Sequence, residues 1–576
     1  MISASLRYAL LLSFFFPIIA WGIEVQIKIL GLEKPLSTNV LAFLSLQQVQ
    51  NHKDLTKQRI YLLHQQAPEE IRQALRPYGY FNPTIKANLQ ETPTTIITSY
   101  QITPGPPTKI VKIDFQINGP GKHAPIFNKA FPIKIGTILK QPAYEQAKQN
   151  LLARAVEHGY LDAHYTRHEL LVDVKTNQAQ IYLHLATGIQ FRFGKITFLQ
   201  NILDPNFLRR YPAFKTGDKF RHSKLLDLQS RLIDSEYFRL VEAKIQRDKA
   251  QDDLVPIEIS LEPNAQDRYR TGIGFSTDTG PRISFDWTRR RIGNQGSRLN
   301  SELRLSAPSS LFKSSYIIPL QRPWQDFVIL SLEAEHVDTE TRKGNRIEIN
   351  ASHSISLSND WRRTIAASYS YEIFEVDTET QTNYNLIPSI TFSRIRQETK
   401  GFIRPGHSIK FQLLGAHSTL LSSSNFLQAH ANANLIHGLG NKWRFLTRGK
   451  LGASLAKTID DIPFSKRFFA GGDNSIRGYM LDQLGPKDSS GTIIGGRFLA
   501  VGSLELERKI WGNWSGAVFY DVGNAFDTEH GSFVTHGIGF GIRWLSPVGT
   551  VRIDLASALS FTDTPWRLHI VVGPEL

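Results

Sequence analysis

The feature that most constrains the fold of this chain is a strict alternation of apolar and polar side chains toward its C-terminal end. In the segment 498–507, one face would carry Phe498, Ala500, Leu504 and Leu506, and the other Val501, Ser503, Glu505 and Glu507. The alternation returns in the segments 518–522, 538–544, 551–555 and 566–572. A period of two places neighbouring side chains on opposite faces of a strand, so each predicted strand separates two environments.

Charged residues identify the second environment as water. Asp521, Arg543, Asp554 and His569 all fall on the less apolar faces. A charge that faces lipid at the centre of a bilayer costs about 2–4 kcal/mol, whereas a water-filled lumen tolerates it. The pattern therefore predicts a transmembrane antiparallel β-barrel that is apolar outside and polar inside.

A soluble β-sandwich is the alternative, because its strands also alternate between core and solvent. Tyr520, Trp544 and Trp566 favour the barrel, since they lie on the apolar faces, where membrane barrels carry interfacial aromatic residues. The N-terminal segment also favours it. Arg7, an apolar run and the small residues around Trp21 predict a cleaved signal peptide, because the run is shorter than the roughly 20 residues of a membrane-spanning helix.

Composition narrows the functional classes. The chain has no cysteine, which excludes thiol nucleophiles, thiolate metal sites and disulfides, and we expect no catalytic residue, metal or cofactor. The formal net charge of +15 indicates attraction to anionic surfaces. A secreted chain does not meet nucleic acid, so membrane lipids are the expected anionic partners. We interpret the densest basic run, Arg289-Arg290-Arg291, as an interfacial turn.

Three copies of one landmark precede the predicted barrel. They are the segments 74–81, 154–161 and 231–238, whose tyrosines are Tyr80, Tyr160 and Tyr237. Similar segments at a regular spacing indicate one supersecondary unit that is repeated. Around the second copy, the pattern predicts a helix over Pro142 to Glu157 and strands over 162–174 and 178–185. The repeated unit is therefore strand, helix, helix, strand, strand.

These patterns predict five segments. They are a signal peptide over 1–22, three α+β repeats over 23–107, 108–187 and 188–264, and a barrel over 265–576. Each strand of an outer-membrane barrel takes roughly 10 residues, and turns and loops add as much again, so about 16 strands fit the last segment.

A long connection between Phe464 and Gly496 interrupts the strand pattern. Glycines and aromatic residues surround one arginine, Arg477, which indicates a folded loop. An arginine that leaves bulk water requires a carboxylate partner. The alternation offers two candidates on lumenal faces of the next two strands, Glu505 and Asp521.

The sequence Ile476-Arg477-Gly478-Tyr479 resembles the loop motif of the BamA superfamily, and Phe519-Tyr520-Asp521-Val522-Gly523 resembles its partner strand motif. The repeats resemble POTRA domains, the periplasmic modules of that superfamily. Three repeats, the segment 272–282 and the ending Gly573-Pro574-Glu575-Leu576 are most similar to the TamA family. The resemblance implies that the loop folds back into the barrel, that Arg477 pairs with Asp521, and that Glu505 lies nearby.

The predicted first and last strands of the barrel contain residues that weaken pairing. Gly272 and Gly274 lie on one face of the first strand, and Gly573 and Pro574 end the last. Glycine adds no side-chain packing and proline removes a hydrogen-bond donor. We therefore expect a seam that opens laterally, although strand curvature would also explain these glycines.

The resemblance implies an outer-membrane factor that inserts client β-barrels such as autotransporters, together with a TamB-like periplasmic protein anchored in the inner membrane. Unfolded outer-membrane proteins and membrane lipids are the other expected partners. Two alternatives stay open, namely lipid transport to the outer membrane with the same partner, and a protein export pore similar to two-partner secretion transporters. A hydrolase built on Ser560, Asp563 and His569 is disfavoured, because no pattern places a nucleophile beside a base.

Overall fold

The computed structural model describes residues 24–573, apart from 51, 53–54, 129–130, 377–378, 399–401, 528–532 and 547–548. The predicted signal peptide and Pro574 lie outside the described residues. The chain folds as two compact units, and the division between them falls inside the third repeat. None of the described helices is both long enough and apolar enough to cross a membrane.

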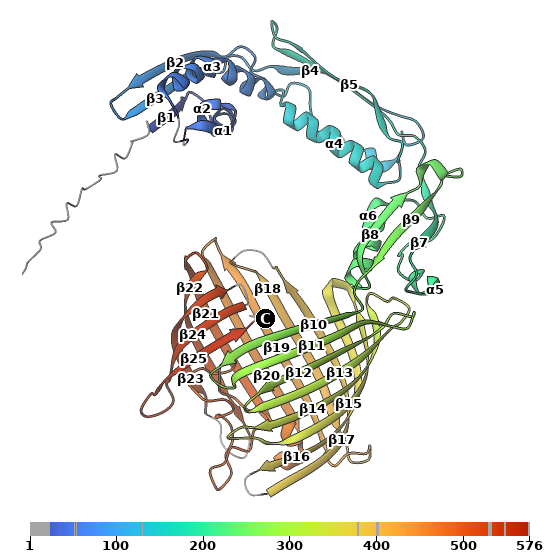
Figure 1. Ribbon diagram of the computed structural model, residues 1–576, viewed down its shortest axis with the longest axis vertical. Helices are drawn as coiled ribbons and strands as arrows, with labels where there is room; N and C mark the ends of the chain where they lie inside the picture. Colours follow the sequence, from blue (N-terminus) through green and yellow to red (C-terminus); the bar gives the residue numbers. More distant parts are fainter. Residues whose placement is uncertain are drawn as a thin grey trace, which may run out of the picture. The chain divides into compact units, whose positions relative to one another are not determined.

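Each repeat contains one three-stranded sheet and helices (Figure 1). The elements of the first are β1 (Glu24–Leu30), α1 (Lys34–Phe43), α2 (Ser45–Val49), α3 (Lys57–Leu75), β2 (Thr84–Glu91) and β3 (Thr95–Thr103). Those of the second are β4 (Lys109–Asn118), α4 (Gln141–Glu157), β5 (His164–Asp173) and β6 (Gln178–Ala186). Those of the third are β7 (Arg192–Leu199), α5 (Pro205–Leu208), α6 (His222–Asp234), β8 (Phe238–Ile245) and β9 (Leu254–Pro263). The sheet orders are β1-β3-β2, β4-β6-β5 and β7-β9-β8, so the last strand of each repeat is central.

The repeated landmark ends a helix and begins the connection to the next strand. Gly79 and Gly159 have φ values of 87° and 89°, a backbone conformation that glycine adopts without strain. The carbonyl of Gly79 accepts a hydrogen bond of 2.8 Å from the N–H of Thr108, and that of Gly159 accepts one of 2.8 Å from Phe191. The third copy has Glu236 at the corresponding position, with a φ of 61°.

The remaining strands, β10 to β25, form a closed antiparallel barrel of sixteen strands, as the alternation predicted. Its first eight strands are β10 (Asp267–Ser276), β11 (Gly280–Ile292), β12 (Ser297–Ser306), β13 (Ser309–Pro319), β14 (Asp326–Asp338), β15 (Lys343–Ser356), β16 (Trp361–Val376) and β17 (Glu379–Gln397). The others are β18 (Gly406–Ala416), β19 (Phe426–Leu439), β20 (Trp443–Leu455), β21 (Phe498–Trp511), β22 (Trp514–Phe526), β23 (Thr535–Ser546), β24 (Gly549–Ala558) and β25 (Trp566–Gly573).

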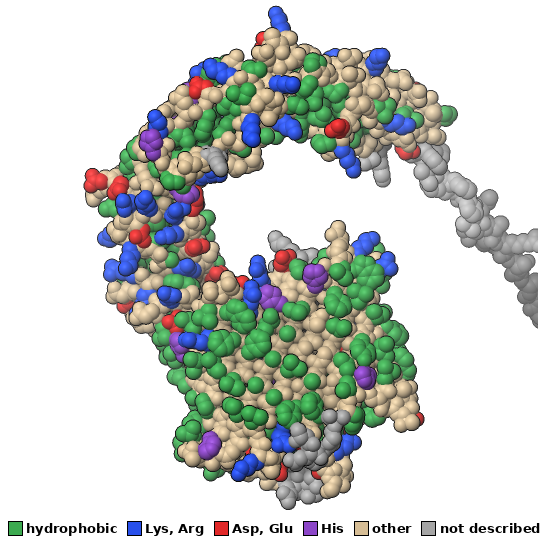
Figure 2. Space-filling model, turned by 180° about the vertical axis from the view of Figure 1, so that it is seen from behind, with side chains coloured by type: hydrophobic (Ala, Val, Ile, Leu, Met, Phe, Trp, Pro, Cys, Tyr) green, Lys and Arg blue, Asp and Glu red, His purple; other side chains and the backbone are tan. Residues whose placement is uncertain are grey.

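The outer face of the barrel wall is apolar and the inner face is charged, as the sequence pattern predicted. Along β22, Val518 and Tyr520 are 56% and 39% exposed, whereas the alternating residues Phe519 and Asp521 are buried. The outer wall is covered by apolar side chains, which are green in Figure 2. The inner wall carries charges, among them the buried Glu505, Arg543 and Asp554. Apolar residues therefore face lipid, and ionised residues face the lumen.

Candidate functional site: the inward-folded loop and the barrel seam

The long connection begins directly after β20 and runs over 456–497, so it starts earlier than the Phe464 expected from sequence. Its apolar residues pack against the inner wall. Phe468, Ala470, Ile476 and Tyr479 form one buried cluster with Val501 of β21, Ala525 of β22 and Ala558 of β24. Because these partners belong to the wall, the loop lies inside the barrel.

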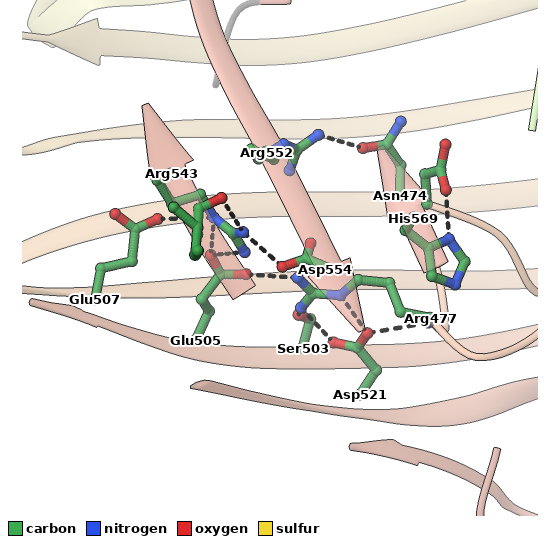
Figure 3. A network of polar contacts seen from close by, with 12 residues as sticks. Asn474, Arg477, Ser503, Glu505, Glu507, Asp521, Arg543, Arg552, Asp554 and His569 are labelled. Carbon is green, nitrogen blue, oxygen red and sulfur yellow. Dashed lines mark hydrogen bonds and ion pairs between the residues drawn. The ribbon is translucent and has the colours of Figure 1, made fainter. Parts of the chain in front are cut away.

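Arg477 occupies the centre of this packing and is only 1% exposed (Figure 3). Its Nε and Nη2 donate to the two carboxylate oxygens of Asp521, over 2.8 and 3.0 Å. Its backbone N–H also donates to Asp521, over 3.0 Å, and its Nη1 donates to Glu505 Oε2 over 2.7 Å. The guanidinium carbon lies 3.4 Å from the ring centroid of Phe519. The structure thus brings together the three charged residues that were singled out in the sequence.

The ion network extends beyond those three residues. Asp554 is a third carboxylate partner of Arg477, because its Oδ2 accepts a hydrogen bond of 3.3 Å from Arg477 Nη1. Arg543 Nη2 donates to Glu505 Oε1 over 2.7 Å, and Arg543 Nη1 donates to Asp554 Oδ1 over 2.5 Å. Buried charges are tolerated when each has an opposite partner and hydrogen bonds. The network therefore joins the loop to β21, β22, β23 and β24 at once.

Gly478 and Tyr479 continue the attachment of the loop. The N–H of Gly478 donates to His569 Nε2 over 2.9 Å, and the Tyr479 hydroxyl donates to the carbonyl of His536 over 3.2 Å. Gly478 has a φ of 100°, and a Cβ there would lie 2.9 Å from the backbone nitrogen of Ala558. A side chain at this position would therefore both strain the backbone and push the loop off β24.

Gly523 belongs to the wall that receives the loop. Its φ is 144°, and a Cβ there would lie 2.1 Å from the carbonyl oxygen of Ala500 in β21. Gly523 does not contact Arg477 itself; it permits close pairing of β21 and β22 beyond Asp521. Among the predicted loop residues, Gly523 thus has an indirect role.

Several residues of the site were not assigned to it from sequence. Arg543, Asp554 and His569 were placed on lumenal faces by the alternation, but nothing paired them with the loop. Gly537 of β23 was also missed: a Cβ there would lie 2.2 Å from the carbonyl oxygen of Arg477. The glycines at alternate positions of β23 are the available signal, since they leave the inner wall without side chains where the loop lies.

The barrel closes where β10 meets β25, and that seam is short. Only Phe275 opposite Val572 and Ser276 opposite Val571 pair there in the described strands, whereas every residue of β10 has a partner in β11. Thr277 adds two contacts, since its N–H donates to the carbonyl of Ile570 over 3.0 Å and its Oγ1 accepts from Ile570 N over 2.6 Å. Among the described residues, most of the β10 edge therefore has no strand beside it.

The glycines of the seam have a more specific effect than weak packing. Arg282 of β11 reaches over β10 and donates through Nη2 to the carbonyl of Val572, over 2.8 Å. A Cβ at Gly274 would lie 2.5 Å from Arg282 Nε, and a Cβ at Gly573 would lie 2.8 Å from Arg282 Nη2. These two glycines leave room for Arg282 to bridge the seam. Gly272 instead faces Ser284, whose Oγ would lie 2.6 Å from its Cβ.

The loop also holds both edges of the seam, through Asp473. One carboxylate oxygen of Asp473 accepts from the Ser276 hydroxyl of β10, and the other contacts His569 Nδ1 of β25. The N–H of Asp473 donates to Asp278, which follows β10. Asp473 and His569 are buried. We call Ser276, Asp278, Asp473 and His569 the seam clasp.

The clasp resembles a metal site, because ligating atoms of Asp278, Asp473 and His569 lie within 4.8 Å of one another. Hydrogen bonding of His569 argues against that use. Its Nε2 accepts from the N–H of Gly478, so the proton resides on Nδ1 and is donated to Asp473. Neither nitrogen then offers a lone pair to a metal. Ser560 is not bonded to His569; its hydroxyl accepts from the N–H of His536.

Comparisons with known proteins agree with this architecture. Residues 265–573 match the Omp85 superfamily domain, and residues 26–104 match the family described as POTRA domain TamA domain 1. The outer membrane protein assembly factor BamA of Neorickettsia risticii is 21% identical over 65% of this chain and 54% of its own length. BamA of Nitratidesulfovibrio vulgaris is 22% identical over 60% of this chain and 46% of its own. The chain thus spans about half the length of these curated relatives.

A solved structure shares the fold. The crystal structure of BamA from Haemophilus ducreyi lacking POTRA domains 1–3 superposes with a TM-score of 0.70, at 17% identity. The superposition covers 81% of this chain and 99% of that one.

Proposed function

Because this chain belongs to the Omp85 superfamily and is an outer-membrane barrel with periplasmic POTRA repeats, we propose that it inserts client β-barrel proteins into the outer membrane through its seam. The observation that carries the proposal is the short pairing of β10 with β25. An unpaired strand edge is a template on which an extended client segment can add a strand. In the described part of the chain, the segment from Asp267 to Gly274 presents such an edge.

The loop gives the seam a fixed frame. The Arg477 network joins the loop to the strands β21–β24, and the clasp joins it to β10 and β25. Opening the seam therefore requires rupture of a few backbone hydrogen bonds, the Arg282 bridge and the clasp. The wall around Arg477 can stay intact during that change, because its contacts do not include β10.

The partner in this proposal is a TamB-like protein anchored in the inner membrane, and the clients are unfolded outer-membrane proteins such as autotransporters. The match of residues 26–104 to the first TamA POTRA domain supports this partner. In that repeat β2 is an edge strand with mostly exposed side chains, which would accept an added strand of the partner.

A reversible lock of the seam tests the proposal. The chain has no cysteine, so Phe275→Cys with Val572→Cys places one disulfide between the opposed residues of β10 and β25. In proteoliposomes, oxidation should abolish insertion of a client barrel, and reduction should restore it. The matched control is Leu332→Cys with Ile349→Cys, an opposed lipid-facing pair of β14 and β15. Full insertion by the oxidised seam variant would refute the proposal.

A further inference from the structure

A group of basic side chains lies at one end of the outer barrel wall, on three neighbouring strands. It consists of Arg363 of β16, Arg394 and Arg396 of β17, and His407 of β18, and we call it the basic rim. Arg394 lies opposite Trp361, and Arg396 lies opposite His407. Arg394 and Arg396 share a face with Phe392, whose side chain is 36% exposed on the lipid-facing wall. The basic rim therefore continues the outer face.

The direction of the strands places this group at the periplasmic end. β10 starts where the third repeat ends, and neighbouring strands of the barrel are antiparallel. Even-numbered strands therefore start at the periplasmic end and odd-numbered strands finish there. Arg363 lies near the start of β16, Arg396 near the finish of β17 and His407 near the start of β18.

The basic rim lacks acceptors among the described residues. Nε of Arg363, Nε of Arg394 and Nε2 of His407 are buried atoms with no hydrogen-bond partner in the described part of the chain. Two other arginines on the outer face near this end, Arg289 and Arg508, have partners. Arg289 Nε lies 4.0 Å from Asp267 Oδ1, and the Arg508 guanidinium lies 5.1 Å from the ring centroid of Trp443. These side chains are half-buried or exposed, so their free donors are within reach of an anion from outside the chain.

An apolar groove in the lipid-facing wall adjoins the basic rim. Its volume is about 640 Å³, and its lining includes Phe392, Phe411, Ala429, Ala431, Ala453 and Ala500. Phe392 lies opposite both Arg363 and Phe411, so the groove begins directly beside the rim. The rings of Trp361 and Phe411 are stacked with centroids 6.4 Å apart.

We propose that this face binds one anionic glycerophospholipid of the periplasmic leaflet, with its phosphate at the basic rim and an acyl chain in the groove. A phosphate diester has only acceptors, which match the unpartnered guanidinium donors. Tryptophan at this level marks the membrane interface, where head groups lie. Alanines make the groove shallow and smooth, and a methylene chain fills it. A soluble phosphate would use the rim but not the groove.

The position of the lipid separates it from the proposed insertion activity. β17 and β18 are the eighth and ninth of the sixteen strands, so the lipid site lies across the barrel from the β10–β25 seam. Loss of the lipid and loss of seam opening are therefore distinguishable. The inference does not depend on the proposed function.

The test is native mass spectrometry of the full-length protein in detergent, titrated with phosphatidylglycerol or phosphatidylcholine. The wild type should retain phosphatidylglycerol preferentially. The triple variant Arg363→Gln, Arg394→Gln, Arg396→Gln should lose that preference, with affinity for phosphatidylglycerol falling roughly fivefold for each arginine. The control variant Arg289→Gln, Arg508→Gln removes two partnered arginines of the outer wall at the same end, outside the basic rim, and should bind like the wild type. Folding of each variant is checked by its heat-modifiable electrophoretic mobility.

A second variant tests the groove. Ala431→Leu keeps the wall apolar but fills the groove, so it should weaken binding of phosphatidylglycerol while the charges are intact. Equal affinity of the wild type for the two lipids, or unchanged binding by the folded triple variant, would overturn the proposal. Complete displacement of phosphatidylglycerol by equimolar inorganic phosphate would also overturn it, because the rim would then be a simple anion site.

Discussion

The pairing of β21 with β22 and the pairing of β25 with β10 lie close together in the same wall, yet they are built in opposite ways. Every residue from Phe498 to Lys509 has a partner in β22, and the lumenal face of this pair carries Glu505 and Asp521 of the ion network. Two residue pairs join β25 to β10, supplemented by Thr277, Arg282 and the clasp.

The difference shows where this barrel is able to change shape. Charged pairs buried around Arg477 resist separation, because each carboxylate would lose its partner in a buried site. The seam is instead held by single hydrogen bonds, each of which contributes about 0.5–1.5 kcal/mol net. A conformational change of the barrel therefore separates β10 from β25 before it disturbs the pairing of β21–β24.

The largest expected effect is at the ion network. Arg477→Ala removes the cation that Asp521, Glu505 and Asp554 share. Its loss should destabilise the attachment of the loop to the barrel wall by roughly 3–5 kcal/mol. Limited proteolysis should then cut the connection 456–497, which the wild type protects. Client insertion should fall as well, because the frame of the seam is lost.

Arg552→Ala is the matched control for that change. Arg552 is a lumenal arginine that also touches the loop, but its hydrogen bond of 3.3 Å goes to the amide oxygen of Asn474. Its loss should leave protection of the loop nearly unchanged. If Arg477→Ala and Asp521→Asn both support full insertion, the ion network has no functional role.

The next effect is at the clasp. Asp473→Ala removes the carboxylate that joins Ser276 to His569, and loss of these buried hydrogen bonds should weaken the seam by roughly 1–3 kcal/mol. Hydrogen exchange of β25 should accelerate, whereas exchange of β22 should not change. An equal acceleration in both strands would contradict the comparison, because the clasp would then stabilise the wall as a whole.

Sequence alternation predicted the barrel and the lumenal position of Asp521, because the period of a strand is local and its two environments differ strongly. The strand number followed from the length of the last segment. Parity and charge gave two candidate partners for Arg477, Glu505 and Asp521, and the resemblance to the BamA superfamily implied the pairing with Asp521. Asp473 could not be found this way. Its contacts with Ser276, Asp278 and His569 depend on the path of an irregular loop and on the closure of β10 against β25, which no local pattern encodes.

The role of Gly274 was also not predictable from the local sequence. Its position in the first strand suggested weak packing, but the structure shows that it makes room for a side chain of β11. Only the crossing of Arg282 over β10 gives this glycine its role, and that crossing depends on three strands at once.

The smallest expected effect concerns that crossing. Gly274→Ala places a Cβ where Arg282 Nε now lies, so the side chain must move and its bond to the carbonyl of Val572 should break. Arg282→Met removes the same bond without changing the backbone of β10. Because a single hydrogen bond contributes about 0.5–1.5 kcal/mol net, both variants should destabilise the seam by a similar small amount. Oxidation rates of the Phe275→Cys, Val572→Cys pair measure this. A loosened seam in Arg282→Met but not in Gly274→Ala would mean that the arginine reaches β25 by another path, and that the glycine serves strand curvature instead.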